Sequence, residues 1–150
     1  MQEGRATANE KKTKRMQLDA RARAILCAQT GADNRGRDVI VLDMRELVKY
    51  VDYLVLISAS SRRQGAAISD QIEAELTKVG ETKEGIEGYE LGNWIVLDYG
   101  DVIVHIFNDE KRDYYQLEHL WGDAPRVNWQ RTSETTGPAG STSAEQPPLT

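Results

Sequence analysis

The apolar residues of this chain recur at helical spacing in three segments. In the first segment they occupy positions 18, 22, 25 and 26, which predicts an amphipathic helix over residues 16–30 that stops at Gly31. In the second, positions 68, 72, 76 and 79 are apolar, so we expect a helix over residues 62–79. In the third, Asp109 can serve as the N-cap of a last helix over residues 109–121.

End signals support the second helix. Ser61 is followed three residues later by Gln64, which is the spacing of a capping box, and Gly80 comes directly after the last apolar position. Arg62 and Arg63 would occupy the first turn, where cations oppose the helix dipole. Since that penalty is at most about 1 kcal/mol, solvated arginines are the simpler interpretation.

Between the predicted helices the apolar residues form continuous runs. The segments "DVIVLDM" (38–44) and "YLVLISA" (53–59) have the length and composition of strands that are covered on both faces. The glycine-punctuated "GIEGYELGN" (85–93) is typical of a loop that could hold one short strand, and "LGNWIVLDYGDVIVHIF" (91–107) is typical of two strands around a tight turn. The order of elements therefore predicts an α/β fold, with a small mixed β-sheet flanked by helices.

The predicted hairpin separates two kinds of side chain. If residues 99–100 form a two-residue loop, Asp98 faces Asp101 across the strands. In the same register Trp94 faces His105. One face is then purely aliphatic and is expected in the core: Ile95, Leu97, Val102, Val104 and Ile106. The other face carries every residue that a core does not need: Trp94, Val96, Asp98, Asp101, Ile103 and His105. A type I turn with a bulge at Gly100 would shift this pairing.

The second hairpin face points to a function. Two carboxylates directly opposite one another cost stability, so Asp98 and Asp101 suit a partner with basic groups, a metal ion or acid chemistry. Tryptophan is a frequent interface anchor, which makes Trp94 a candidate contact. The structural alternative is a helix that covers this face and buries Trp94. A metal- or nucleotide-dependent enzyme is a further hypothesis, but two carboxylates without a third ligand make a poor metal site, so we assign none.

The two ends of the chain differ in composition from its centre. Residues 1–15 are polar and basic, and residues 131–150 are rich in Ser, Thr, Gly and Pro. Both bury too little apolar surface to offset chain entropy, so we expect disordered ends around one domain over residues 16–130. A single cysteine, Cys27, with neither a signal-peptide pattern nor an apolar run of membrane-spanning length, favours a reducing cytoplasm.

Charge and motifs narrow the function classes. The chain carries a net charge of −5 although residues 1–15 are basic, so the central domain is acidic. Such a domain repels phosphate backbones, which argues against direct specific binding of nucleic acid. It would attract basic proteins. Alternatively, the negative charge only keeps the domain soluble. The sequence has no glycine-rich phosphate loop, no HExxH motif and no Gly-x-Ser-x-Gly motif, so we expect neither an enzyme nor a cofactor.

Three segments carry a resemblance to a known family. They are "VDYLVLISASSRRQGAAISDQI" (51–72), "EGYELGNWIVLDYGDVIVHIF" (87–107) and "RDYYQLEHLWGDAP" (112–125). In sequence, order and spacing they resemble the signature blocks of the ribosomal silencing factors, also called the Iojap family. Two departures are visible: Val51 stands where the family usually has Thr, and Ala59 where it usually has Gly.

The resemblance implies a fold and a function. The fold would be a small α/β domain similar to nucleotidyltransferases but without their catalytic acids. The function would be to bind the large ribosomal subunit through its protein number fourteen, to block association with the small subunit, and to repress translation under nutrient limitation. A role in large-subunit assembly is also attributed to the family, and members can form homodimers.

The resemblance also suggests which residues contact the partner. Trp94 matches the tryptophan of the family and would be the buried anchor, with His105 packed beside it. Three acids match family positions and would face basic groups of the ribosomal protein: Glu87, Asp98 and Asp101. Four further residues match the family blocks and either touch the partner or hold the second helix: Tyr53, Ser61, Arg62 and Asp70.

Overall fold

The structure, a computed structural model, describes residues 18–108 and 121–131. Its helices and strands are α2 (Ala20–Asp33), β1 (Arg37–Asp43), β2 (Tyr53–Ala59), α3 (Arg62–Lys78), β3 (Gly85–Glu87), β4 (Trp94–Asp98) and β5 (Val102–Asn108). The predicted last helix and the predicted disordered ends lie outside the described residues, apart from positions 121 and 131.

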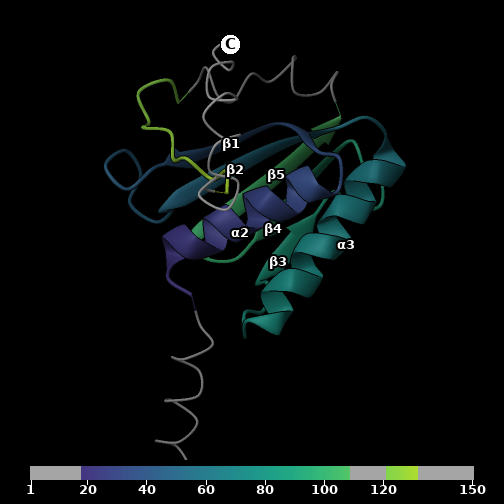
Figure 1. Cartoon of the computed structure of the whole chain (residues 1–150), viewed down its shortest axis with the longest axis horizontal. Helices are drawn as coiled ribbons and strands as arrows, with labels where there is room; N and C mark the ends of the chain where they lie inside the picture. The colour runs from purple at the N-terminus through teal and green to yellow at the C-terminus, as the bar shows by residue number, and fades with distance from the viewer. Residues whose placement is uncertain (1–17, 109–120, 132–150) are drawn as a thin grey trace, which may run out of the picture.

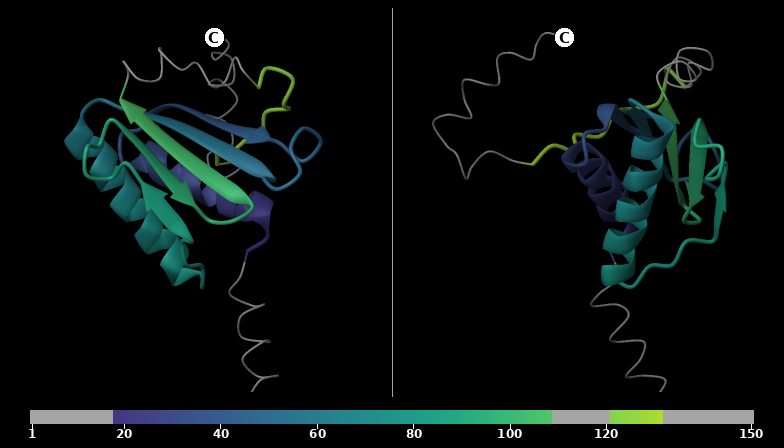
Figure 2. Two further views of the ribbon diagram at one scale, coloured as in Figure 1. Left: turned by 180° about the vertical axis from the view of Figure 1, so that it is seen from behind. Right: turned by 90° about the vertical axis from the view of Figure 1, so that its right-hand side faces the viewer.

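The strands form one mixed sheet in the order β1-β2-β5-β4-β3. Strands β2 and β5 run parallel, and the other neighbours are antiparallel, which confirms the predicted mixed sheet. Helices α2 and α3 cover the same face of this sheet (Figure 1). Seen from the side, the two helices form one layer and the strands form another (Figure 2). We call the side of the sheet that faces away from α2 and α3 the second face.

Helix α2 packs closely on the sheet because most of its buried residues are small. Asp19 caps the helix and accepts a hydrogen bond from the Ala22 N–H at 2.8 Å. Gly31 does not stop the helix as predicted, because it lies within it against Ile57: a Cβ at Gly31 would come within 2.6 Å of the Ile57 Cδ1 atom. The buried positions differ from the predicted apolar stripe: they are Arg23, Ala24, Cys27, Ala28, Thr30 and Gly31.

Helix α3 begins and ends close to the predicted positions. The Ser61 hydroxyl accepts a hydrogen bond from the Gln64 N–H at 3.1 Å, which confirms the N-cap. The Gln64 side chain accepts from the N–H of Ser60 at 2.8 Å rather than from that of Ser61, so the second half of the predicted capping box is displaced by one residue. At the other end Gly80 has a φ of 88°, the left-handed conformation that terminates helices.

The turn between β4 and β5 lies one residue later than predicted. It consists of Gly100 and Asp101, and the Tyr99 N–H closes it by donating to the Val102 carbonyl at 2.9 Å. Gly100 adopts a φ of 86°, whereas the predicted turn would have required a positive φ at Tyr99. A turn with a positive φ at its first position alone matches type II′, in which glycine is favoured there.

Moving the turn by one residue shifts the strand pairing by two. Trp94 faces Phe107 instead of His105, and Asp98 faces Ile103 instead of Asp101. The predicted register is therefore wrong. The predicted faces are nevertheless right for the strand residues. Side chains alternate between the faces with a period of two, so a shift of two residues leaves each side chain on its predicted face. The residues of the predicted core face are each 0% exposed: Ile95, Leu97, Val102, Val104 and Ile106.

A segment that follows the sheet in the chain pairs with the outer edge of β1. Residues 125–127 run along β1, where the Asp43 N–H donates to the Pro125 carbonyl and the Val127 N–H donates to the Val41 carbonyl, both at 2.8 Å. A second apolar cluster forms beside this segment: Leu42, Met44, Leu54, Leu56, Phe107 and Ala124. Trp94 packs at the border of that cluster, where it is only partly buried.

Candidate functional site

Three aromatic side chains meet on the second face, where β4 lies beside β5. The rings of Trp94 and Phe107 stack with their centroids 5.3 Å apart and their planes inclined by 23°. His105 stacks on Phe107 with a centroid distance of 5.8 Å and an inclination of 12°. We call these three residues the aromatic cluster. Phe107 is 1% exposed, whereas Trp94 and His105 are only partly buried. The aromatic cluster therefore extends from the apolar interior to the surface.

A hydrogen bond joins two members of the aromatic cluster. The Trp94 Nε1–H donates to His105 Nδ1 at 2.9 Å, which confirms that the histidine packs beside the tryptophan. A ring nitrogen can accept a hydrogen bond only when it carries no proton. Burial also lowers the pKa of His105 to about 4. At neutral pH the cluster is therefore uncharged.

Two of the predicted acids lie on the same face as the aromatic cluster. Glu87 of β3 faces Val96, and Val96 faces His105, so these residues form one row across three strands. Glu87 is exposed at the edge of the sheet. Asp98 lies further along β4 and accepts a hydrogen bond from the Gly100 N–H at 2.8 Å. The aromatic cluster therefore has two carboxylates on its face: that of Glu87, on the neighbouring strand β3, and that of Asp98, on the same strand as Trp94.

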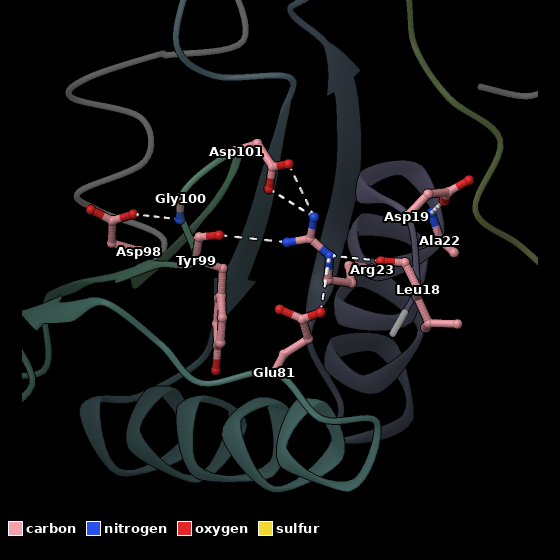
Figure 3. A network of polar contacts seen from close by, with 9 residues as sticks. All are labelled: Leu18, Asp19, Ala22, Arg23, Glu81, Asp98, Tyr99, Gly100 and Asp101. Carbon is pink, nitrogen blue, oxygen red and sulfur yellow. Dashed lines mark hydrogen bonds and ion pairs between the residues drawn. The ribbon is translucent and has the colours of Figure 1, made fainter. Parts of the chain in front are cut away.

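Asp101 does not lie opposite Asp98 on this face, contrary to the prediction. It lies in the hairpin turn, and its carboxylate forms an ion pair with Arg23 of α2 at 2.9 Å (Figure 3). The Arg23 guanidinium also donates to the Tyr99 carbonyl at 3.5 Å and lies 3.8 Å from the Glu81 carboxylate. These contacts fasten the hairpin turn to α2 from the helix side of the sheet. Arg23 is only 7% exposed, so solvent screens them little.

The facing pair of aspartates on which a metal site would have depended is not formed. Within residues 18–108 and 121–131, no group of three or more His, Cys, Asp or Glu side chains could hold a metal ion. The thiol of Cys27 is buried among apolar groups, and burial raises its pKa to about 12. It stays protonated at neutral pH and is no candidate nucleophile.

The four remaining candidates lie in the core or on the helix side. Tyr53 is 2% exposed in the core beneath the helices. Ser61 caps α3, and Arg62 is exposed in its first turn. Asp70 of α3 accepts a hydrogen bond from the Tyr89 hydroxyl at 2.9 Å, which ties the loop between β3 and β4 to the helix. The burial of Tyr53 and the hydrogen bonds of Ser61 and Asp70 favour a role in holding the fold.

Two shallow grooves lie beside the loop that connects β3 to β4. The first, of about 640 Å³, is lined by Asp70 and Glu87 together with other residues of α3 and β3. The second, of about 620 Å³, is lined by Ser61, Arg62 and Leu91. Four predicted residues from distant parts of the chain thus line these neighbouring grooves: Ser61, Arg62, Asp70 and Glu87. None of the four belongs to the aromatic cluster.

Sequence reasoning missed two residues that shape this region. Phe107 follows His105 by two positions, so strand alternation alone placed it on the second face, but the predicted pairing ended before it. Arg23 lies 78 residues from Asp101 in the chain, and no local pattern links the two. The first residue could have been found from the sequence, and the second could not.

Comparison with known proteins places this chain in a family. The family model described as "Ribosomal silencing factor during starvation" matches residues 17–148. The chain belongs to the ribosomal silencing factor family. The family is named for a regulatory role, the silencing of ribosomes. In the described part of the chain no helix is long and apolar enough to cross a membrane.

Individual relatives and a solved structure show how far the similarity extends. The ribosomal silencing factor RsfS of Bacillus subtilis is 38% identical over 93 residues, which are 62% of this chain and 79% of that protein. The Mus musculus protein "Mitochondrial assembly of ribosomal large subunit protein 1" is 30% identical over 88 residues, which are 57% of this chain and 39% of that longer protein. A crystal structure of a Chromobacterium violaceum protein is 32% identical and superposes with a TM-score of 0.68, covering 70% of this chain and 88% of that one.

Proposed function

We propose that this ribosomal silencing factor binds the large ribosomal subunit through that subunit's protein number fourteen, and that it thereby blocks joining of the small subunit and represses translation when nutrients are limiting. The observation that carries the proposal is the aromatic cluster of the second face, with carboxylates beside it. Steric occlusion suffices for this function, so no bond has to be formed or broken.

The composition of the second face suits an interface with a basic protein. Partly exposed tryptophan is enriched among residues that contribute most to binding, and truncating such an anchor typically costs about 2–4 kcal/mol. Trp94 fits this description because the stack on Phe107 fixes its ring while part of it stays accessible. Glu87 and Asp98 would complement basic side chains of a ribosomal protein and would accelerate its encounter with this face.

Sedimentation with purified ribosomal subunits tests the proposal. We expect the protein to migrate with the large subunit and not with the small one in a sucrose gradient. When the two subunits are then mixed, prior addition of the protein should reduce the peak of joined ribosomes. Migration with the small subunit, or unchanged joining at saturating protein, would contradict the proposed function.

A role in assembly of the large subunit is a second candidate. It is favoured by the similarity to the Mus musculus protein, which is named for mitochondrial assembly of that subunit. The same gradient experiment distinguishes the two roles when precursor particles are compared with mature subunits. Preferential binding to precursors would favour assembly, and equal binding together with blocked joining would favour silencing.

A metal- or nucleotide-dependent enzyme is not proposed. That hypothesis depended on Asp98 and Asp101 facing each other, and the observed pairing places Ile103 opposite Asp98. Asp101 is instead engaged by Arg23. Calorimetric titration with divalent metals and nucleotides should accordingly show no binding in the micromolar range, and such binding would revive the hypothesis.

A further inference from the structure

The hydrogen bond within the aromatic cluster determines where the proton of His105 resides. Neutral imidazole carries one N–H, on either Nδ1 or Nε2. Since Nδ1 accepts the Trp94 Nε1–H at 2.9 Å, the proton must lie on Nε2. The partner of one ring nitrogen thus fixes the chemical character of the other, which becomes a hydrogen-bond donor.

The Nε2–H donor of His105 is not used within the described structure. Among residues 18–108 and 121–131, Trp94 is the only hydrogen-bond partner of the His105 ring. The side chain lies on the second face and is partly buried, so the donor is in a place of reduced solvation next to the indole. A donor in such a place gains more from a protein acceptor than one that is fully hydrated.

We propose that Trp94 and His105 act as one recognition unit, in which the indole N–H holds the histidine as its Nε2–H tautomer so that it donates a hydrogen bond to an oxygen acceptor of the bound protein. This inference rests on the proposed function and adds the chemistry of the contact. His105 positions the indole through Nδ1 and selects an acceptor through Nε2. Stacking of both rings on Phe107 keeps the unit in one orientation.

The structure distinguishes this unit from a simple apolar patch. A phenylalanine at position 105 would preserve the stacking but would lack the ring nitrogen that accepts the Trp94 Nε1–H. A protonated imidazole would present N–H groups at both nitrogens and would oppose the indole N–H. The lowered pKa of His105 is consistent with the neutral form that the geometry requires.

The tautomer can be measured in the wild-type chain without any ribosome. In long-range ¹H–¹⁵N correlation spectra at neutral pH, we expect His105 to show a protonated Nε2 and an unprotonated Nδ1. We also expect slow solvent exchange of the Trp94 indole proton. Signals are assigned with Trp94→Phe and His105→Gln. A proton on Nδ1, or equal populations of both tautomers, would overturn the inference.

Affinity for the large subunit tests the donor. His105→Phe should weaken binding about fivefold, the size expected for one net hydrogen bond, while His105→Gln, which keeps an acceptor and a donor, should recover most of the loss. Circular dichroism confirms that both variants are folded. Wild-type affinity in His105→Phe, or equal weakening in both variants, would overturn the inference and leave the proposed function intact. Failure of the wild-type protein to bind the subunit would overturn both.

Discussion

The two faces of the β4–β5 hairpin are built from alternate residues of the same strands, yet they differ in chemistry. On the helix side, Ile95, Leu97, Val104 and Ile106 are aliphatic and 0% exposed beneath α2 and α3. On the second face, the aromatic cluster combines apolar rings with ring nitrogens that can donate and accept hydrogen bonds. The helix side has the composition of a core, and the second face has that of a recognition surface.

We infer that this short hairpin stabilises the fold with one face and presents the proposed binding surface with the other. Side chains on opposite faces of a strand do not share neighbours, so a change on one face leaves the other face largely intact. The turn reinforces this separation, because Arg23 fastens it from the helix side (Figure 3). The aromatic cluster lies at the other end of the hairpin, where Trp94 faces Phe107. Substitutions on the two faces should therefore affect different measurements.

The largest effect on stability is expected from Ile95→Ala. It removes a fully buried side chain from the helix side, so the free energy of unfolding should fall by about 2–5 kcal/mol. Urea denaturation measures this change. Val96→Ala, on the second face of the same strand, is the matched control and should cost about 1 kcal/mol or less, because Val96 is only partly buried. A larger loss from the control would reverse the assignment of the faces.

Trp94→Ala should have the largest effect on binding. Removal of an anchor residue is expected to weaken affinity for the large subunit at least about thirtyfold, equivalent to about 2 kcal/mol or more. The domain should stay folded, with a smaller loss of stability than in Ile95→Ala, because Trp94 is only partly buried. Affinity is measured by co-sedimentation at a temperature where both variants are folded. Weaker binding by Ile95→Ala than by Trp94→Ala would contradict the account.

Arg23→Met tests the fastening of the turn. The change leaves the carboxylates of Asp101 and Glu81 without their cation, so stability should fall by about 2–3 kcal/mol; the partial exposure of Asp101 keeps the loss below that of a fully buried pair. Arg131→Met is the control, because Arg131 pairs with Asp33 at 3.0 Å on the surface. Breaking that exposed pair should change stability by less than about 1 kcal/mol. Equal effects of both substitutions would show that the Arg23 network contributes no more to stability than an exposed ion pair does.

A further prediction concerns the pH dependence of stability, which should reflect the titration of His105. Its pKa is about 4 in the folded protein and near 6.5 in the unfolded chain, so below about pH 6.5 the unfolded chain takes up a proton that the folded protein does not. The free energy of unfolding should therefore fall as the pH is lowered from about 6.5 towards 4, by at most about 1.4 kcal/mol for each pH unit. Above pH 6.5 the histidine is neutral in both states and has no such effect.

His105→Gln provides the control for the pH dependence, since glutamine does not titrate. Urea denaturation at about pH 7 and about pH 5 should show a smaller loss of stability in this variant than in the wild-type protein. Carboxylates titrate in both proteins and cancel in the difference. Identical losses would mean that His105 is not held in its neutral form.

Much of this fold could be predicted from local patterns in the sequence. The run at 53–59 coincides with β2, because a strand covered on both faces is apolar throughout. The faces of the hairpin followed from alternation, and they survived an error in register because that error was an even number of residues. The error itself came from placing the turn one residue early, at a position that would have forced Tyr99 into a conformation that glycine adopts more easily.

Other features depend on contacts between distant segments and leave no local signal. Gly31 resembles a helix stop but serves close packing against Ile57. Asp101 resembles one half of a carboxylate pair but is neutralised by Arg23, which lies on another element. In the candidate site, the neighbouring positions of Trp94 and His105 could be predicted, whereas their direct hydrogen bond could not, because it depends on the actual register and on side-chain orientation.

Photochemical crosslinking tests most directly whether the second face meets the ribosome. p-Benzoylphenylalanine is placed at Glu87, exposed on the second face, and in a separate variant at Gln71, exposed on α3. After irradiation of complexes with the large subunit, we expect the residue at position 87 to crosslink to protein number fourteen and the residue at position 71 to give no such product. A crosslink from position 71 to that protein, with none from position 87, would contradict the account.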